Sequence, residues 1–140
     1  MDSDEVKSRL HRLFDEAMNK GSFEVLNELL SENFISHGFN ISSGPQGYVQ
    51  FITILRGAFP DLHVEVENMI AEGDKVASRG TFSGTHKGDF MNLKATGKQL
   101  VFSYIDMWRL EDGKFVENWS LLDVLKLMQE LGIAPQPDQE

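Results

Sequence analysis

The chain contains no cysteine, which excludes disulfide bonds, thiol nucleophiles and cysteine-ligated metal sites. It also lacks a long apolar run, because no stretch approaches the roughly 20 residues that a membrane-spanning helix needs. Basic residues are few, with 13 Lys and Arg against 22 Asp and Glu, so the net charge is −9. We therefore do not expect nucleic acid as a partner, since binding it needs a basic surface, and the missing apolar run argues against a membrane. The acidic start is not a secretory signal, and together with the missing cysteines it favours a cytoplasmic location.

What is present is the composition of an ordinary folded domain. The 140 residues are 41% hydrophobic and 25% charged, and a chain of this length can bury a core of its own without staples. No internal repeat or low-complexity segment is visible. We expect a single domain over residues 1–140, with a flexible tail from about residue 134, just before Pro135.

The first third of the chain has helical periodicity. Apolar residues recur at spacings of three and four from about Asp4 to Asn19, which predicts a helix with one buried face. This face consists of Val6, Leu10, Leu13, Phe14, Ala17 and Met18. A second helix opens at Ser22 and includes Leu29 and Leu30, and a third follows the break at Gly44-Pro45-Gln46-Gly47. A short helix that Gly132 closes ends the pattern.

From Leu62 onward the period changes to two, which is typical of half-buried strands. Strands are expected from Leu62 to about Met69, from Val76 to about Lys87, from about Lys98 to Leu110, and after the Gly113 turn. A brief early strand covers Phe34 to His37. Helices before strands predict an α+β fold, in which three N-terminal helices pack on one face of a strongly curved antiparallel sheet and a short C-terminal helix follows.

The last hairpin decides which side chains share a face. Phe102, Tyr104, Asp106, Trp108 and Leu110 fall on one face by the two-residue period. A three-residue loop at Glu111-Asp112-Gly113 sets Asp106 opposite Asn118, Trp108 opposite Val116 and Tyr104 opposite Ser120. A two-residue turn instead places Trp119 beside Asp106, and both registers stay open. In either register the face is aromatic with one acid, which suits a ligand pocket.

A series of short motifs resembles the SnoaL-like polyketide cyclases, in the order and over nearly the whole length that the family shows. The motifs are Gly44-Pro45-Gln46-Gly47, Ala58-Phe59-Pro60-Asp61-Leu62, Ile70-Ala71-Glu72-Gly73-Asp74-Lys75-Val76, Gly84-Thr85-His86-Lys87-Gly88, Ala95-Thr96-Gly97-Lys98, Leu110-Glu111-Asp112-Gly113-Lys114 and Glu117-Asn118-Trp119. The resemblance implies the cone-shaped fold of nuclear transport factor 2 and ketosteroid isomerase. It also implies a homodimer or homotetramer built on the sheets.

The same resemblance implies a chemistry. The family's cyclases close a ring by an intramolecular aldol reaction without cofactor or metal, and an acid near the end of the last strand removes a proton next to a carbonyl. The matching position here is Asp123. Two departures weaken the support around it: Asn118 stands where the family often has a histidine, and Gly38 follows His37 where an aspartate is common. Asn118 forms hydrogen bonds but does not titrate.

Asp123 as a general base is one of two interpretations, because aspartate is also a favoured N-cap and a helix is expected to begin there. Asp106, with Trp108 beside it, is the second acid of the expected pocket. We expect His37, Tyr104 or Asn118 to stabilise an enolate oxygen of an apolar carbonyl substrate.

Two alternatives to this chemistry remain. A non-catalytic ligand-binding or dimerisation module on the same fold is the main one. An epoxide hydrolase built on Arg79 or Arg109 ranks low, because neither arginine lies two residues from Asp106 on the same strand face. No histidine pair has metal-binding spacing, so no metal site is expected.

Overall fold

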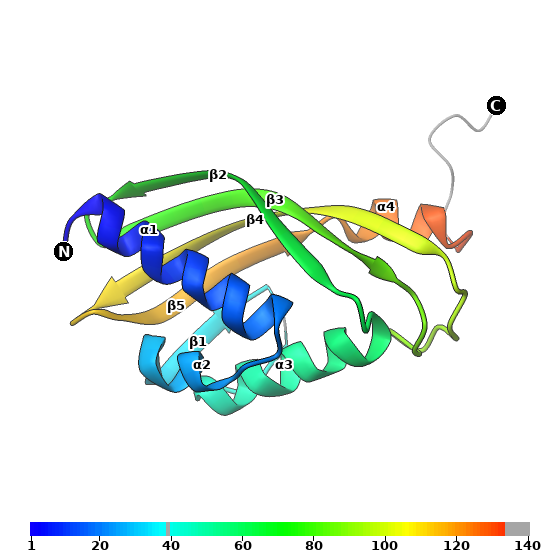
Figure 1. The fold of residues 1–140 in the computed structure, drawn as a ribbon, viewed down its shortest axis with the longest axis horizontal. Helices are drawn as coiled ribbons and strands as arrows, with labels where there is room; N and C mark the ends of the chain where they lie inside the picture. Colours follow the sequence, from blue (N-terminus) through cyan, green and yellow to red (C-terminus); the bar gives the residue numbers. More distant parts are fainter. Residues whose placement is uncertain (39, 134–140) are drawn as a thin grey trace.

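The computed structural model of the chain describes residues 1–38 and 40–133, so the expected flexible tail from about residue 134 lies outside the described residues. Figure 1 shows helices packed on one side of a long, twisted sheet. In chain order the elements are α1 (Ser3–Arg12), the π-helical segment η1 (Leu13–Asn19), α2 (Glu24–Leu29), β1 (Leu30–His37), α3 (Gly44–Ala58), β2 (His63–Glu72), β3 (Lys75–Thr85), β4 (Gln99–Glu111), β5 (Lys114–Leu122) and α4 (Val124–Glu130). The expected α+β class is confirmed.

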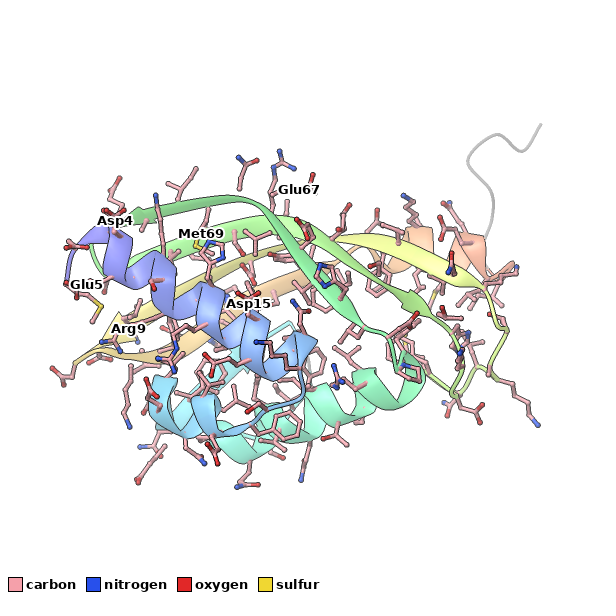
Figure 2. The ribbon with its side chains drawn as sticks, viewed as in Figure 1. Asp4, Glu5, Arg9, Asp15, Glu67 and Met69 are labelled. Atoms are coloured by element: carbon pink, nitrogen blue, oxygen red, sulfur yellow. The ribbon has the colours of Figure 1, made fainter. Side chains whose placement is uncertain are left out.

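The long N-terminal helix is the first layer over the sheet. Asp2 caps α1 by accepting a hydrogen bond from the Glu5 amide, and η1 continues the helix without a break. The six apolar residues of the predicted face are all buried. Figure 2 shows Asp4 and Glu5 at the N-terminal end of α1, where negative charge is favourable to the helix dipole. This helix therefore covers the sheet with the apolar stripe that its sequence predicts.

The sheet has five strands in the order β1-β5-β4-β3-β2. β2, β3, β4 and β5 form an antiparallel meander, as expected, with a bulge at Glu67 in the edge strand β2. The expected early strand is present but longer than predicted, and it is an exception to the expected antiparallel pairing. β1 begins at Leu30 directly after α2, and it pairs with β5 in parallel. The long α3 crossover and the whole meander separate β1 from β5, so no short hairpin forces these two strands to run antiparallel.

Burial alternates along β4, and this confirms the predicted face. Its inner residues, Phe102, Tyr104, Asp106, Trp108 and Leu110, are all buried. Outer residues such as Val101, Ile105 and Met107 are exposed. The helices cover the inner face, so the aromatic row lies in the core (Figure 1).

The register of the last hairpin differs from both predictions. Its turn is a two-residue one, in which Asp112 and Gly113 have φ of 51° and 80°, and Glu111 pairs with Lys114. Left-handed backbone at both central residues is the type I′ geometry that strand twist favours. A bulge at Val116 then adds one residue to β5, so Asp106 lies opposite Ser120 and Trp108 opposite Asn118. Compared with the first predicted register, β5 is displaced along β4 by two residues. Because side chains alternate with a period of two, each side chain of β5 stays on its predicted face of the sheet.

Among residues 1–38 and 40–133, no helix is long and apolar enough to cross a membrane.

Candidate active site

A polar cluster lies in the middle of the inner face, where β3 and β4 pair. The Ser78 hydroxyl is 2.5 Å from Asp106 Oδ1 and 3.2 Å from Tyr104 Oη. A hydroxyl carries one hydrogen, so Ser78 donates to the carboxylate of Asp106 and accepts from Tyr104. All three side chains are buried. The sequence placed Tyr104 and Asp106 together, and the structure adds Ser78.

The surroundings of Asp106 favour its neutral form. Burial raises the pKa of Asp106 from 3.8 to about 6, although hydrogen bonds from Ser78 oppose this rise. The Trp108 indole N–H also favours the carboxylate through its proximity, but it does not form a hydrogen bond of good geometry. Burial likewise raises the pKa of Tyr104 to about 12, and the nearby charge of Asp106 contributes. An acid with a pKa near 6 can both accept and return a proton close to neutral pH.

Three further buried polar atoms, in the row that crosses the sheet at Trp108, have no hydrogen-bond partner among the described residues. They are Ser36 Oγ, Trp108 Nε1 and Asn118 Oδ1. Register brings them into one row, since Ser36 pairs with Asn118 across β1 and β5, and Asn118 pairs with Trp108 across β5 and β4. Buried polar groups are nearly always satisfied, so a row of unsatisfied ones calls for an explanation such as a water or a ligand oxygen.

Aromatic rings enclose the row. Trp108 stacks on Phe34 at 5.7 Å between ring centroids and meets Phe115, Tyr48 and Phe14 edge to face at 5.2, 5.8 and 6.3 Å. Burial is also the main cause that raises the pKa of Tyr48, and the charge of Asp106 adds to it. A few polar atoms inside an aromatic wall match the general make-up of a small-molecule site.

His37 is not part of this cluster. It lies on the outer side of β1, where its Nε2 is 2.9 Å from Glu117 Oε2 and its ring stacks on Trp119 at 5.2 Å. Glu117 also accepts a hydrogen bond from Arg109 Nε at 2.7 Å. The His37 hydrogen bond, followed by the one from Arg109, lowers the pKa of Glu117.

Asp123 also lies away from the cluster. It is the N-cap of α4, its Oδ1 accepts a hydrogen bond from the Lys126 amide at 3.1 Å, and its own amide donates to Ser103 O. The carboxyl group is exposed. This is the capping geometry of the second interpretation, and it leaves the role of Asp123 as a base a prediction.

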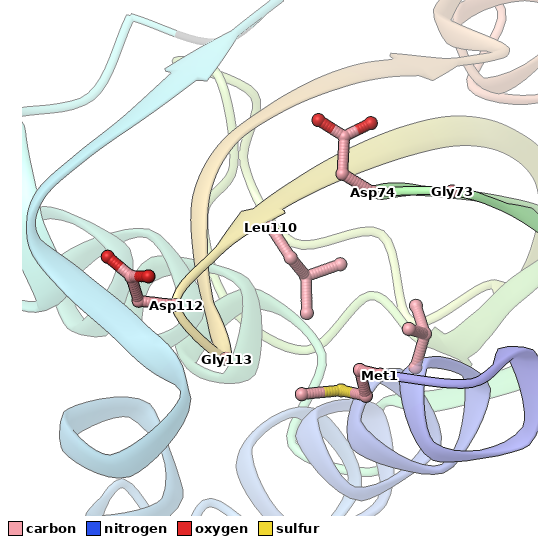
Figure 3. A pocket seen from close by; sticks show the side chains of 7 residues that line it. Met1, Gly73, Asp74, Leu110, Asp112 and Gly113 are labelled. Atoms are coloured by element: carbon pink, nitrogen blue, oxygen red, sulfur yellow. The ribbon is translucent and has the colours of Figure 1, made fainter.

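Two of the surface hollows bear on the candidate site. One of about 420 Å³ lies on the outer side of the sheet and is lined by residues that include His37, Ile105, Met107, Trp119 and Leu121. Another of about 480 Å³ lies between two hairpin turns and the start of α1 (Figure 3). In Figure 3 the carboxyl groups of Asp74 and Asp112 point away from Leu110 and Met1, so this second hollow offers no convergent polar groups.

Sequence reasoning missed Ser36, Ser78 and Tyr48. Ser78 has a signal in the pattern, because it alternates with Val76 and Gly80 on the buried side of β3. Ser36 could be found only by knowing that β1 pairs with β5, and Tyr48 reads simply as an apolar position of the third helix.

The fold and this site define a class: a small α+β protein with a curved sheet that encloses a buried acid. The model of the SnoaL-like polyketide cyclases matches residues 8–131. The chain therefore belongs to the SnoaL-like polyketide cyclase family.

Individual relatives of the chain support the same family assignment. The chain is 28% identical to the aklanonic acid methyl ester cyclase DauD of Streptomyces sp. (strain C5) over 137 residues, which cover 94% of this chain and 84% of DauD. It is 26% identical to the aklanonic acid methyl ester cyclase DnrD of Streptomyces peucetius, over 94% of this chain and 93% of DnrD. Its structure matches TsrD from Streptomyces laurentii with a TM-score of 0.88 at 27% identity, over 95% of this chain and 98% of TsrD.

Proposed function

We propose that this protein is a cyclase that closes a ring in a polyketide-like carbonyl compound by an intramolecular aldol reaction. The observation that carries the proposal is the buried carboxyl of Asp106, with a pKa of about 6, on the same buried face as three polar atoms that lack partners among the described residues. Family membership and the two cyclase relatives support the reaction class.

In the proposed reaction, the carboxylate takes a proton from the carbon next to one carbonyl, and an enolate forms. The enolate carbon attacks a second carbonyl carbon of the same molecule, so one carbon–carbon bond forms and the second carbonyl becomes an alkoxide. The carboxylic acid returns its proton to this alkoxide, which leaves a hydroxyl group. Atoms and electrons balance within the substrate, so the step needs no redox cofactor.

We assign proton abstraction to Asp106, because burial makes its carboxylate more basic. Trp108 Nε1 and the Ser36 hydroxyl are donors without partners, and they would bind the developing enolate oxygen. Asn118 Oδ1 would accept from a substrate hydroxyl. The aromatic rings around Trp108 enclose these groups, so the substrate must displace part of that packing to reach them.

Asp123 is the rival base, because it stands at the family's position for the acid. Its accessibility favours it, since its carboxyl is exposed and only one oxygen is used for the cap. Leu121 and Leu125 next to it are 72% and 58% exposed, so an apolar substrate lying on them would remove water from Asp123. The two acids make opposite predictions in one experiment.

The test is turnover of aklanonic acid methyl ester by the purified protein, with product formation followed by chromatography. Asp106→Asn is expected to lower kcat by about 10² to 10⁴, the usual contribution of a general base. Asp123→Asn, which keeps a good cap, is the matched control, and its kcat should stay within a few-fold of wild type.

If Asp123→Asn abolishes turnover and Asp106→Asn does not, the base is Asp123. Binding of the ester without conversion by the wild type would instead identify a non-catalytic binding module.

We also propose that two copies associate through the outer face of the sheet. Ile35, Ile105 and Leu121 on this face are 50%, 60% and 72% exposed, and Trp119 beside them is 39% exposed. An apolar surface of this kind on neighbouring strands is typical of a protein contact. Light scattering after gel filtration should give the mass of a dimer or tetramer for the wild type and of a monomer for Ile105→Glu. A wild-type monomer at all concentrations would refute this association.

A further inference from the structure

Within residues 1–38 and 40–133, a fourth buried polar atom without a partner belongs to His86, at the opposite end of the inner face from Ser36. His86 follows β3 and is 0% exposed. Its backbone is fully used, because its amide donates to Lys98 O at 2.9 Å and its carbonyl accepts from the Gly97 amide at 2.8 Å. Its side-chain Nε2 has no hydrogen-bond partner among the described residues.

The neighbours of His86 determine which ring nitrogen carries the proton. The Thr96 amide donates to His86 Nδ1 at 3.3 Å, and the Thr96 hydroxyl lies 3.0 Å from the same nitrogen. A backbone amide only donates, so Nδ1 must offer a lone pair. The neutral ring then carries its hydrogen on Nε2. The unpartnered atom is therefore a donor.

The ring of His86 packs at the edge of an aromatic cluster. The His86 ring lies 5.7 Å from the ring of Phe59, and Phe59 in turn contacts Phe90 and Phe102 at 5.5 and 6.1 Å. Phe59 is the residue that follows α3, Phe90 lies in the segment between β3 and β4, and Phe102 belongs to β4. A buried N–H without an acceptor lowers the stability of a fold, and the phenyl ring of Phe59 offers it no oxygen.

The position of His86 is also fixed from both sides. Asp61 accepts hydrogen bonds from the Thr85 amide and hydroxyl at 2.7 and 2.8 Å. On the other side, the Lys87 and Gly88 amides both donate to Ala58 O at the end of α3. A side chain held this firmly between neighbours is suited to fix the orientation of a ligand.

We propose that His86 Nε2 donates a hydrogen bond to a carbonyl oxygen of a bound aromatic ketone, whose ring packs on Phe59 and Phe90. The inference takes its ligand class from the proposed function, but it concerns binding rather than proton transfer. The segment Gly88–Gly97 is exposed except for partly buried Gly88, Phe90 and Leu93, and it is the part of the chain that would move to admit the ligand.

The binding test uses two matched probes, anthraquinone-2-sulfonate and anthracene-2-sulfonate, which share the ring system and the charge but differ in the carbonyl acceptors. Calorimetry on the full chain should show that His86→Phe weakens the quinone about tenfold, the loss of one useful hydrogen bond. The anthracene should bind both proteins equally. His86→Gln, which keeps a donor, should recover part of the loss, and His11→Phe at an exposed position is the control. Equal affinity of wild type and His86→Phe for the quinone would overturn the proposal.

A second measurement keeps the proposal testable if His86→Phe does not fold. Imidazole ¹H–¹⁵N spectra of the wild type should show the proton of His86 on Nε2, and the quinone but not the anthracene should shift it downfield. A proton on Nδ1 would overturn the proposal. So would an Nε2–H resonance that does not shift when the quinone is added, as expected if a buried water already accepts this hydrogen bond. Asp106→Asn should bind the quinone as the wild type does. Turnover of this variant tests the role of Asp106 as a base, whereas quinone binding by His86→Phe tests the role of His86, so each proposal can fail without the other.

Discussion

The two faces of β4 differ in which side chains they bury: the inner face buries polar groups, and the outer face exposes apolar ones. On the inner face, Asp106 and the indole N–H of Trp108 are polar groups enclosed by aromatic rings. On the outer face, Ile105 and Met107 are apolar side chains that water reaches. Each face is thus incomplete in its own way: the inner one has polar atoms without partners, and the outer one has apolar surface without a cover. The comparison suggests that ligand chemistry belongs to the inner face and association to the outer one.

The largest expected effect is on the inner face. Trp108→Ala removes a fully buried ring that packs on four others, and it should lower the free energy of unfolding by about 3 to 5 kcal/mol. Urea denaturation followed by circular dichroism would measure it. A loss below about 1 kcal/mol would show that the inner row is not the centre of the core.

The second effect is a dependence of stability on pH that comes from Asp106. Its carboxyl titrates near 3.8 when unfolded and near 6 when folded, so the folded state holds the proton more tightly. The free energy of unfolding should therefore fall as pH rises from about 4 to 6, by about 3 kcal/mol from this group, and then level off. Denaturation of wild type and Asp106→Asn across pH 4 to 8 isolates the contribution, because asparagine does not titrate. Parallel curves would contradict the raised pKa.

A smaller effect is expected at Asp123. Asp123→Ala removes the cap of α4 and should destabilise the protein by about 1 kcal/mol, whereas Asp123→Asn should cost only a few tenths. Thermal unfolding of the two variants side by side is sufficient. If both variants unfold like the wild type, the hydrogen bond to the Lys126 amide does not stabilise the helix.

The smallest effect is expected on the outer face. Met107→Ala at a protein concentration that keeps the chain monomeric should change the free energy of unfolding by less than about 0.5 kcal/mol. The same urea titration as for Trp108→Ala provides the value. A loss comparable to that of Trp108 would mean that the outer face is packed rather than free.

Periodicity was sufficient to predict most of the fold. The buried face of α1 and η1 and the inner row of β4 follow from spacings of three to four and of two residues, because burial on one side imposes these repeats. The parallel pairing of β1 with β5 could not be predicted in this way, since a local pattern does not tell which distant strand is the neighbour.

The site was predictable in part for the same reason. Tyr104, Asp106, Trp108 and Asn118 were expected on one face and lie there, even though the register was wrong, because the bulge at Val116 and the shorter turn together displace β5 by an even number of residues. Ser36 and Ser78 come from other strands, and only the sheet order brings Ser78 to Asp106 and Ser36 to Asn118. The placement of His37 on the outer face depends on the parallel register, which the sequence does not contain.

The bulge at Glu67 has a consequence for the solubility of the protein. β2 is an edge strand, and the free backbone groups of an edge can recruit another strand and start a growing aggregate. The bulge interrupts the regular hydrogen-bonding pattern there, and Glu65, Glu67 and Glu72 bring negative charges to the same strand. A second β2 that approached this edge would meet like charges and a mismatched backbone. The irregular strand thus opposes pairing through this edge of the sheet, and this agrees with the proposed association through the outer face.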